Sequence, residues 1–242
     1  MQLDAASLER LVPDGLRPGD VTGEEALRIS LERYDFAAQH ARPGRLLDLA
    51  CGVGYGTRFL TDRAEQLTSA LGVDLSEDAV AYASERYAND RTTFLACDAM
   101  QFDGGEGFDT IVSIETIEHL ADPEAFVGRL VALLRPGGHL VGSVPITPSV
   151  DANPHHLHDF TDRSFRRLVG CHGLEVLDDL VQDQRFGLRA VLTRSEARLE
   201  NMRENLPAWY LRHPGALLRR VASTLRHGFV NRYLTVAWRL PG

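Results

Sequence analysis

Hydrophobic residues recur along the chain with two different periods. Short apolar runs of about five residues, typical of buried β-strands, alternate with longer segments in which apolar residues recur every three or four positions, as in amphipathic helices. Strict alternation predicts parallel strands joined by right-handed helical crossovers, that is, an α/β, doubly wound, mostly parallel seven-stranded sheet. The predicted strands are 45–50, 69–74, 92–97, 109–114, 140–144, 174–181 and 233–240, and the predicted helices are 23–40, 57–66, 77–87, 123–135 and 162–172.

Both ends of the chain depart from this alternation. Thr22 and Glu25 form a capping-box pattern that predicts the start of an N-terminal helical lead-in. Near the other end, two prolines interrupt the helical periodicity of residues 195–226, and residues 186–193 fit either a strand or an extended loop. We therefore expect one domain over residues 1–242, made of a lead-in (1–43), a core (44–193), a helical cap or insertion (194–230) and a last strand (231–242).

The composition is that of an ordinary globular protein. Of the 242 residues, 44% are hydrophobic and 25% are charged, and no apolar run approaches the ~18 residues of a membrane span. The first ten residues include Asp4 and Glu9 and no apolar signal region, so we expect a cytoplasmic protein. Three cysteines without CxxC spacing argue against a disulfide framework and a zinc knot.

Charge is unevenly distributed along the chain. All 26 basic residues are arginine, against 34 acidic residues, but residues 1–193 carry a net charge of −14 and residues 194–242 one of +6. The acidic balance argues against nucleic-acid binding. The basic segment fits a solvated helix face, a lid that stacks on an acceptor through Trp209 and Tyr210, or packing in a homodimer.

A glycine-rich turn follows the first predicted strand. Residues 46–57 read LLDLACGVGYGT, so a strand, a turn and a helix start succeed one another, and such a turn lets the backbone approach an anionic ligand closely. A dinucleotide fingerprint would need glycine at Thr57, whereas the third glycine is Gly56, which argues against NAD. Asp74 and Asp98 end the next two strands, where carboxylates can bind ribose hydroxyls and an adenine amino group.

Five motifs in this order resemble the class I S-adenosylmethionine (SAM)-dependent methyltransferases over residues 44–183. The motifs are DLACGVGYG, VDLS, CDA, FDTIVSIETIEHL and LLRPGGHLVGSVP. The resemblance implies a Rossmann-like fold, SAM as cofactor, and a place for Asp48 near the methionine amino group. Asp48 and Asp98 also fit ordinary acids at strand ends, and Asp74 fits an ordinary acid that precedes a helix. The residues that the resemblance assigns to SAM are Asp48, Ala50 (usually glycine in the family), Gly52, Gly54, Asp74, Leu75, Asp98, Ala99 and Ile114.

The methyl group of a sulfonium needs no activation, so the enzyme must place the acceptor in line and deal with its proton. An amine with a free lone pair needs only positioning. A sugar hydroxyl needs a general base or a metal ion that acidifies it.

Glu115, Glu118 and His119 follow the fourth strand, at the edge where open α/β sheets bind ligands. Positions i, i+3 and i+4 share one helical turn, so the three side chains can converge. The ExxEH pattern resembles that of the ubiquinone-pathway O-methyltransferases, which implies that all three bind Mg²⁺, although magnesium prefers oxygen ligands. Without a metal, Glu118 would cap a helix and His119 would line the SAM pocket.

Three histidines follow the fifth strand. Residues 153–161 read NPHHLHDFT and resemble the NPxHxxxF(T/S) segment of SAM methyltransferases encoded with polysaccharide and antibiotic-sugar pathways. On that match the family histidine is His156, and an imidazole that titrates near neutrality suits a hydroxyl acceptor as its base. His155 and His158 are further catalytic candidates, and loop histidines without a function are the alternative.

The lead-in carries two further motifs of the same branch. Residues 9–13 (ERLVP) and 33–37 (RYDFA) resemble a segment that folds over the cofactor, which implies that Arg33 and Tyr34 line the pocket. We hypothesise a SAM-dependent O-methyltransferase that acts on a hydroxyl of a sugar or oligosaccharide acceptor. The alternatives are N-methylation of an amino sugar or another small natural product, and a non-catalytic SAM- or NAD-binding module.

Overall fold

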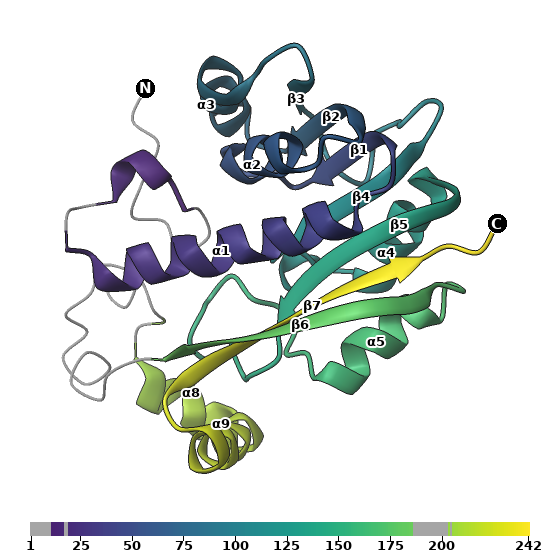
Figure 1. Ribbon diagram of the computed structural model, residues 1–242. Coiled ribbons are helices and arrows are strands. Elements are labelled where there is room, and N and C mark those ends of the chain that lie inside the picture. The colour runs from purple at the N-terminus through teal and green to yellow at the C-terminus, as the bar shows by residue number, and fades with distance from the viewer. Residues whose placement is uncertain (1–10, 17–18, 186–202, 204) are drawn as a thin grey trace.

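The computed structural model describes residues 11–16, 19–185, 203 and 205–242. Seven strands form one sheet in the order β3-β2-β1-β4-β5-β7-β6, in which β7 alone runs antiparallel to its neighbours (Figure 1). The predicted seven-stranded, mostly parallel, doubly wound sheet is confirmed. The strands are β1 (Gly44–Leu49), β2 (Leu67–Asp74), β3 (Thr92–Ala96), β4 (Phe108–Ile114), β5 (Leu134–Pro145), β6 (Glu175–Arg185) and β7 (Val230–Arg239).

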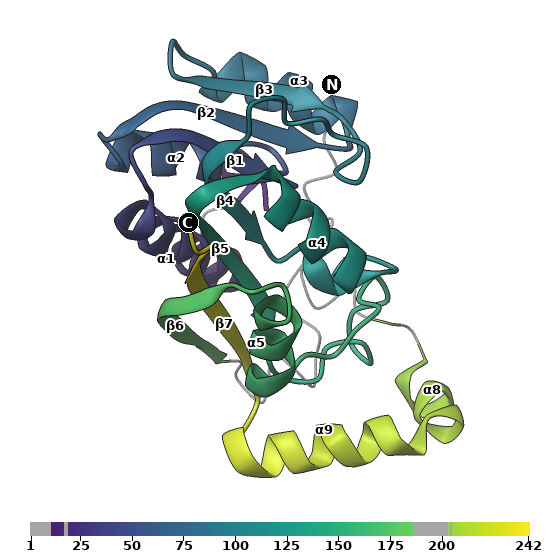
Figure 2. The same cartoon turned by 90° about the vertical axis from the view of Figure 1, so that its right-hand side faces the viewer.

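Helices cover both faces of the sheet. Helices α1, α2 and α3 lie on one face and α4 and α5 on the other, while α8 and α9 lie beyond the sheet next to the start of β7 (Figures 1 and 2). The helices are α1 (Val21–His40), α2 (Tyr55–Arg63), α3 (Glu77–Tyr87), α4 (Pro123–Leu133), α5 (Asp162–Gly170), α8 (Leu206–Arg212) and α9 (Pro214–His227), with short 3-10 helices η1 (Pro13–Gly15) and η2 (Ile117–His119).

Two apolar clusters fill the layers on either side of the sheet. Phe126, Phe165 and Trp238 belong to the cluster beneath α4 and α5. Leu46 and Leu60 belong to the cluster beneath α1 and α2. Because strand side chains alternate between the faces, strands covered on both sides are apolar without interruption, which is why the strands appeared in the sequence as continuous runs.

The first helix begins two residues before its predicted start. The side chain of Asp20 accepts a hydrogen bond from the backbone N–H of Gly23 at 2.9 Å, so Asp20 is the N-cap. Thr22 therefore lies inside the first turn, and the predicted capping box of Thr22 and Glu25 gives way to this single cap.

Proline and glycine residues lie inside β5 and at the starts of α8 and α9. Residues 136–138 lie inside β5. Phe108 of β4 pairs with Leu134 and Thr110 pairs with His139, so the register between the two strands shifts across this segment. Pro207 and Pro214 lie in the first turns of α8 and α9, where a missing N–H costs nothing. The expectations for residues 9–10, 186–193 and 195–202 lie outside the described residues.

No helix in the described ranges combines the length and apolar character needed to cross a bilayer.

Candidate active site

A cavity of about 690 Å³ opens at the carboxyl ends of the parallel strands. It is lined by the loops that follow β1, β2, β3, β4 and β5, and by side chains of α1 and α9. The chain order of the strands reverses between β1 and β4 at this edge, which is the place where open α/β sheets bind ligands. The glycine loop and the ExxEH segment, predicted separately, thus line one common cavity.

The glycine loop between β1 and α2 adopts left-handed backbone conformations. Ala50, Gly52 and Gly54 have φ angles of 69°, 58° and 80°. A Cβ added to Gly52 would have no atom within 4 Å, so this part of the loop faces open space. The Gly52 N–H donates to Oδ2 of Asp74 at 2.9 Å, which holds the loop against the end of β2. These features fit a loop whose backbone contacts a ligand.

Seven of the nine residues assigned to SAM line the cavity, and Asp48 and Gly54 do not. A Cβ at Gly54 would lie 2.6 Å from Ala83 Cβ and from the ring of Phe94, so this glycine is required by packing. The side chain of Leu75 is 73% exposed beside Asp74, where it can cover a flat ring. The seven lining residues are Ala50, Gly52, Asp74, Leu75, Asp98, Ala99 and Ile114.

Asp48 is fully buried beneath the loop. Its Oδ2 accepts a hydrogen bond from the hydroxyl of Thr57 at 2.6 Å, and its Oδ1 has no hydrogen-bond partner among the described residues. Burial raises the pKa of Asp48 to about 7, against the opposing effect of the Thr57 and Tyr34 hydroxyls. Because Asp48 does not line the cavity, its expected contact with an amino group, directly or through water, stays a prediction.

We expect Asp48→Asn to stabilise the ligand-free protein at pH 8. Because the folded-state pKa of about 7 exceeds the ordinary 3.8, ionisation of Asp48 costs stability that is fully felt above pH 7 and vanishes as the pH falls toward 4. The shift corresponds to ~4 kcal/mol, and the weaker hydrogen bond of a neutral amide offsets roughly half of it. Urea unfolding should therefore show a gain of about 2 kcal/mol at pH 8 and a loss of about 2 kcal/mol at pH 4, where only the weaker hydrogen bond is felt. An equal gain at both pH values would contradict the raised pKa.

Three side chains with ligand atoms meet on the side of the cavity formed by the loops after β4 and β5. Glu118 is fully buried, and neither of its carboxylate oxygens has a hydrogen-bond partner among the described residues. His119 Nε2 lies 4.0 Å from Glu118 Oε1, and the rings of His119 and His156 pack edge to face with centroids 4.6 Å apart. Burial and, next, the charge of Glu115 raise the pKa of Glu118 well above its ordinary value.

Glu115 does not join this group, which corrects the predicted ligand set. The expected helical turn does not form, because Glu115 has a φ of 52° and the 3-10 helix begins only at Ile117. Its carboxylate instead accepts a hydrogen bond from Ser143 Oγ at 2.8 Å and lies 3.7 Å from Arg33 Nη1. Within the described residues, the group of potential metal ligands is Glu118, His119 and His156.

Of the three candidate catalytic histidines, only His156 lines the cavity. His158 Nε2 donates to the backbone carbonyl of Leu120 at 2.9 Å, so His158 joins the two loops. The side chain of His155 is exposed, and its backbone carbonyl accepts a hydrogen bond from His119 Nδ1 at 3.3 Å. His155 and His158 therefore do not line the cavity, because successive residues of a loop point in different directions, and a catalytic role for either stays a prediction.

The lead-in residues Arg33 and Tyr34 both line the cavity. Arg33 is buried, with its guanidinium carbon 4.2 Å from the centroid of the Tyr233 ring and its Nε donating to Gln182 Oε1 at 3.1 Å. Helix α1 thus contributes to the cavity and is also anchored to β6 and β7.

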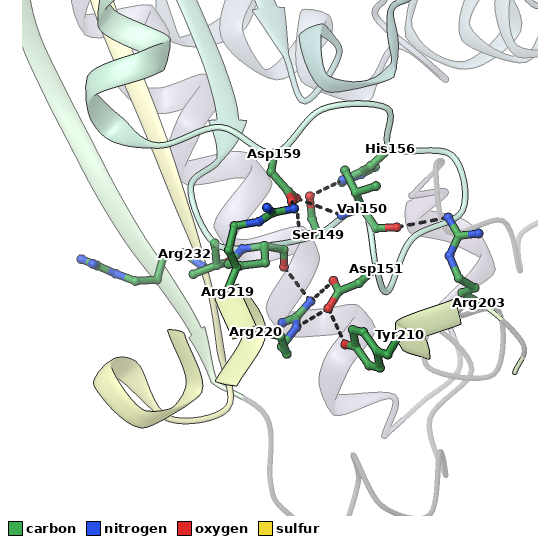
Figure 3. A network of polar contacts seen from close by, with 12 residues as sticks. Ser149, Val150, Asp151, His156, Asp159, Arg203, Tyr210, Arg219, Arg220 and Arg232 are labelled. Atoms are coloured by element: carbon green, nitrogen blue, oxygen red, sulfur yellow. Dashed lines mark hydrogen bonds and ion pairs between the residues drawn. The ribbon is translucent and has the colours of Figure 1, made fainter. Parts of the chain in front are cut away.

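A buried ionic network, which the sequence did not reveal, fastens α8 and α9 to the loop after β5 (Figure 3). Asp151 accepts hydrogen bonds from Arg220 Nε at 2.7 Å and from the Tyr210 hydroxyl at 2.5 Å. Arg220 also donates to the carbonyl of Pro148 at 2.6 Å. Tyr210 and Arg220 line the cavity, so the network builds part of its wall. Arg220 lies 69 positions after Asp151, and no sequence pattern pairs residues so far apart.

Residues 24–191 match the methyltransferase domain family. The chain belongs to this family. It is a SAM-dependent methyltransferase, as its five motifs predicted, and SAM is its cofactor. Family membership excludes one of the three functions considered from the sequence, the non-catalytic binding module.

Known relatives include both O- and N-methyltransferases. A probable SAM-dependent methyltransferase of Mycolicibacterium smegmatis is 29% identical over 186 residues, which cover 69% of this chain and 71% of the relative. The ubiquinone biosynthesis O-methyltransferase of a Bradyrhizobium species is 34% identical over 101 residues, which cover 41% of this chain and only 39% of the relative. The N-methyltransferase NodS from Bradyrhizobium japonicum, solved with S-adenosyl-L-homocysteine, has a TM-score of 0.59 at 18% identity, with 97% of each chain covered. The last likeness concerns the fold.

Proposed function

We propose that this methyltransferase transfers the methyl group of SAM to a hydroxyl of a sugar or glycan. One observation carries the proposal: His156, the histidine of the sugar-associated motif, lines the same cavity as the glycine loop. Its ring Nδ1 lies 2.7 Å from the hydroxyl of Ser149, which fixes the ring and leaves Nε2 for an acceptor. A hydroxyl held by Nε2 would be oriented for in-line attack on the methyl group.

The proton chemistry of His156 differs from the sequence expectation. Burial, followed by the nearby His119 and His155, lowers the pKa of His156 to about 3, so the ring is neutral at pH 7. Such an imidazole cannot deprotonate a free sugar hydroxyl in advance. As the O–C bond forms and the C–S bond breaks, the acceptor oxygen becomes a strongly acidic oxonium, and a weak base then suffices to take its proton. We therefore assign His156 the orientation of the hydroxyl and the late capture of its proton.

His156→Ala should lower kcat for methyl transfer to hydroxyl sugars by about 100-fold, the lower end of general-base effects, because the base is weak. SAM affinity should stay unchanged. The part of kcat that His156→Ala removes should show no ionisation near pH 6.5, because the His156 pKa lies near 3. The measurement is transfer of labelled methyl to a panel of hydroxyl and amino sugars.

His155→Ala is the matched control, because its imidazole is the exposed neighbour in the same loop. Retention of most of the rate by His156→Ala at neutral pH would show that the proton goes elsewhere.

N-methylation of an amino sugar, or of another small natural product, is the second candidate. The observation in its favour is that two carboxyl groups, Glu115 and Glu118, line the cavity and would accept hydrogen bonds from an amino group. Transfer to amino sugars alone in the same assay would establish this alternative.

Magnesium fits the residues of this cavity poorly. Mg²⁺ requires near-octahedral coordination dominated by oxygen, whereas the converging side chains offer one carboxylate and two imidazoles. The second carboxylate, Glu115, is engaged with Ser143. The proposed transfer is therefore built on the residues of the protein alone.

A further inference from the structure

Ligand atoms from two separate loops converge at one point of the cavity wall. Glu118 and His119 come from η2, and His156 comes from the loop after β5. One ligand atom from each of the three side chains lies within 4.8 Å of the other two. Residues 37 or 38 positions apart in sequence thus form one compact group of two nitrogens and one oxygen.

The carboxylate of Glu118 needs a partner that the described residues do not provide. It is fully buried, and both oxygens lack a hydrogen bond within the described part of the chain. His119 Nε2 lies 4.0 Å from Oε1, which is too far for a hydrogen bond. A buried carboxylate without hydrogen bonds is strongly unfavourable. A bound cation would supply the missing charge and ligand bonds at once.

Both imidazoles are held in the orientation that metal ligands adopt. The backbone carbonyl of His155 can only accept, so His119 Nδ1 donates to it and Nε2 keeps its lone pair on the side of Glu118. His156 Nδ1 lies beside Ser149 Oγ at 2.7 Å, which leaves Nε2 available. A hydrogen bond at one ring nitrogen that orients the other toward the ion is the usual outer-shell arrangement of metal-binding histidines.

We propose that Glu118, His119 and His156 form a binding site for a divalent transition-metal ion of the class of Mn²⁺, Fe²⁺, Co²⁺ or Zn²⁺. Two imidazoles and one carboxylate suit these ions and leave coordination positions open toward the cavity. Metal–nitrogen bonds of about 2.1 Å require the side chains to draw together by roughly 1 Å from their present separation. The metal ion would occupy the Nε2 of His156 that the proposed function gives to the acceptor hydroxyl, so the two bind alternately, and metal binding is tested without an acceptor.

Calorimetric titration of chelator-treated enzyme with Mn²⁺, Co²⁺, Zn²⁺ and Mg²⁺ tests the proposal. We expect one transition-metal ion per chain and Mg²⁺ binding that is at least ~100-fold weaker. His156→Ala and Glu118→Gln should each weaken transition-metal binding by about 100-fold, since even outer-shell changes cost 10–100-fold. The visible absorption of bound Co²⁺ should report nitrogen ligands in the wild type and change in His156→Ala.

His155→Ala is the control, because it removes the exposed imidazole next to the site and keeps the backbone carbonyl that His119 contacts. Unchanged SAM binding shows that a variant is folded, and His156→Ala carries the test if Glu118→Gln is unstable. Equal metal binding by the wild type and His156→Ala would overturn the proposal, as would a preference for Mg²⁺. If the wild type bound the metal but transferred no methyl group to hydroxyl sugars, the proposed function would be contradicted and the metal site would not be affected.

Discussion

Gly52→Ala is expected to weaken SAM binding by about 10–100-fold while leaving the fold nearly intact. The added methyl group would meet no protein atom, because a Cβ at Gly52 faces open space at the cavity. It would occupy volume where the loop backbone meets its ligand, and overpacking of this kind costs about 1–3 kcal/mol, or 1.4 kcal/mol per tenfold in Kd. The φ of 58° adds a cost of about 1–2 kcal/mol to the folded state.

Gly56→Ala, four residues later, should affect stability more than SAM binding. A Cβ at Gly56 would lie 2.0 Å from the ring of Tyr34, which is itself buried between α1 and α2. Relief of this clash requires the helices to separate, so we expect a loss of about 3 kcal/mol of stability. Thermal unfolding with and without SAM, together with calorimetry, separates the two effects. Wild-type SAM affinity in Gly52→Ala would show that this loop is not the SAM site.

Local periodicity was enough to predict the elements of the core. The predicted helix 77–87 matches α3 residue for residue, because Ser76 caps it locally and its apolar positions follow one face. The order of the last two strands in the sheet could not be predicted from the sequence. Strand β7 enters between β5 and β6 as the antiparallel member, and this choice depends on pairing between segments about 50 to 100 residues apart.

The cofactor side of the cavity was predictable because parallel strands end at a common edge. Asp74 and Asp98 follow adjacent strands, so topology alone brings them to one cavity. The acceptor side depends on loop conformations that carry no periodic signal. The left-handed φ of Glu115, a residue that is not glycine, removed the assumed helical turn and with it the predicted ligand set.

Ion pairs within the chain explain part of the uneven distribution of charge along the sequence. Four arginines in the described part of residues 203–242 form ion pairs with acids of the core, at separations that no pattern in the sequence indicates. Three of the four acids lie on the exposed or half-buried surface, where such pairs contribute little. The exception is the pair of Arg220 with Asp151, in which the carboxylate is buried and the arginine is mostly buried. Much of the positive charge therefore complements the chain itself. The four pairs are Arg219–Asp159, Arg220–Asp151, Arg232–Asp183 and Arg239–Glu175.

Arg220→Met is expected to destabilise the attachment of α8 and α9 by about 3–5 kcal/mol, the usual cost of leaving one buried partner of an ion pair uncompensated. Asp151 is only 2% exposed. Burial raises its pKa, but the hydrogen bonds and charge of Arg220, together with hydrogen bonds from Tyr210 and the Ala152 backbone, outweigh burial and lower this pKa. Because this pKa is depressed, the pair stabilises the fold above pH 3.8 and its contribution is lost as the pH falls through the folded-state value. Urea unfolding and limited proteolysis of α8–α9 at pH 7 should report the loss, with a smaller difference at pH 3.

Arg219→Met is the matched control for this prediction. Arg219 precedes Arg220 on α9, its side chain is 62% exposed, and it lies 3.8 Å from Asp159, so its removal should cost less than ~0.5 kcal/mol. The double variant Asp151→Asn with Arg220→Met should recover part of the stability, because no buried charge is left alone. Equal effects of Arg219→Met and Arg220→Met would show that the network does not hold the cap. Since Arg220 and Tyr210 line the cavity, detachment of α8–α9 should also raise the KM for the acceptor more than it lowers SAM affinity.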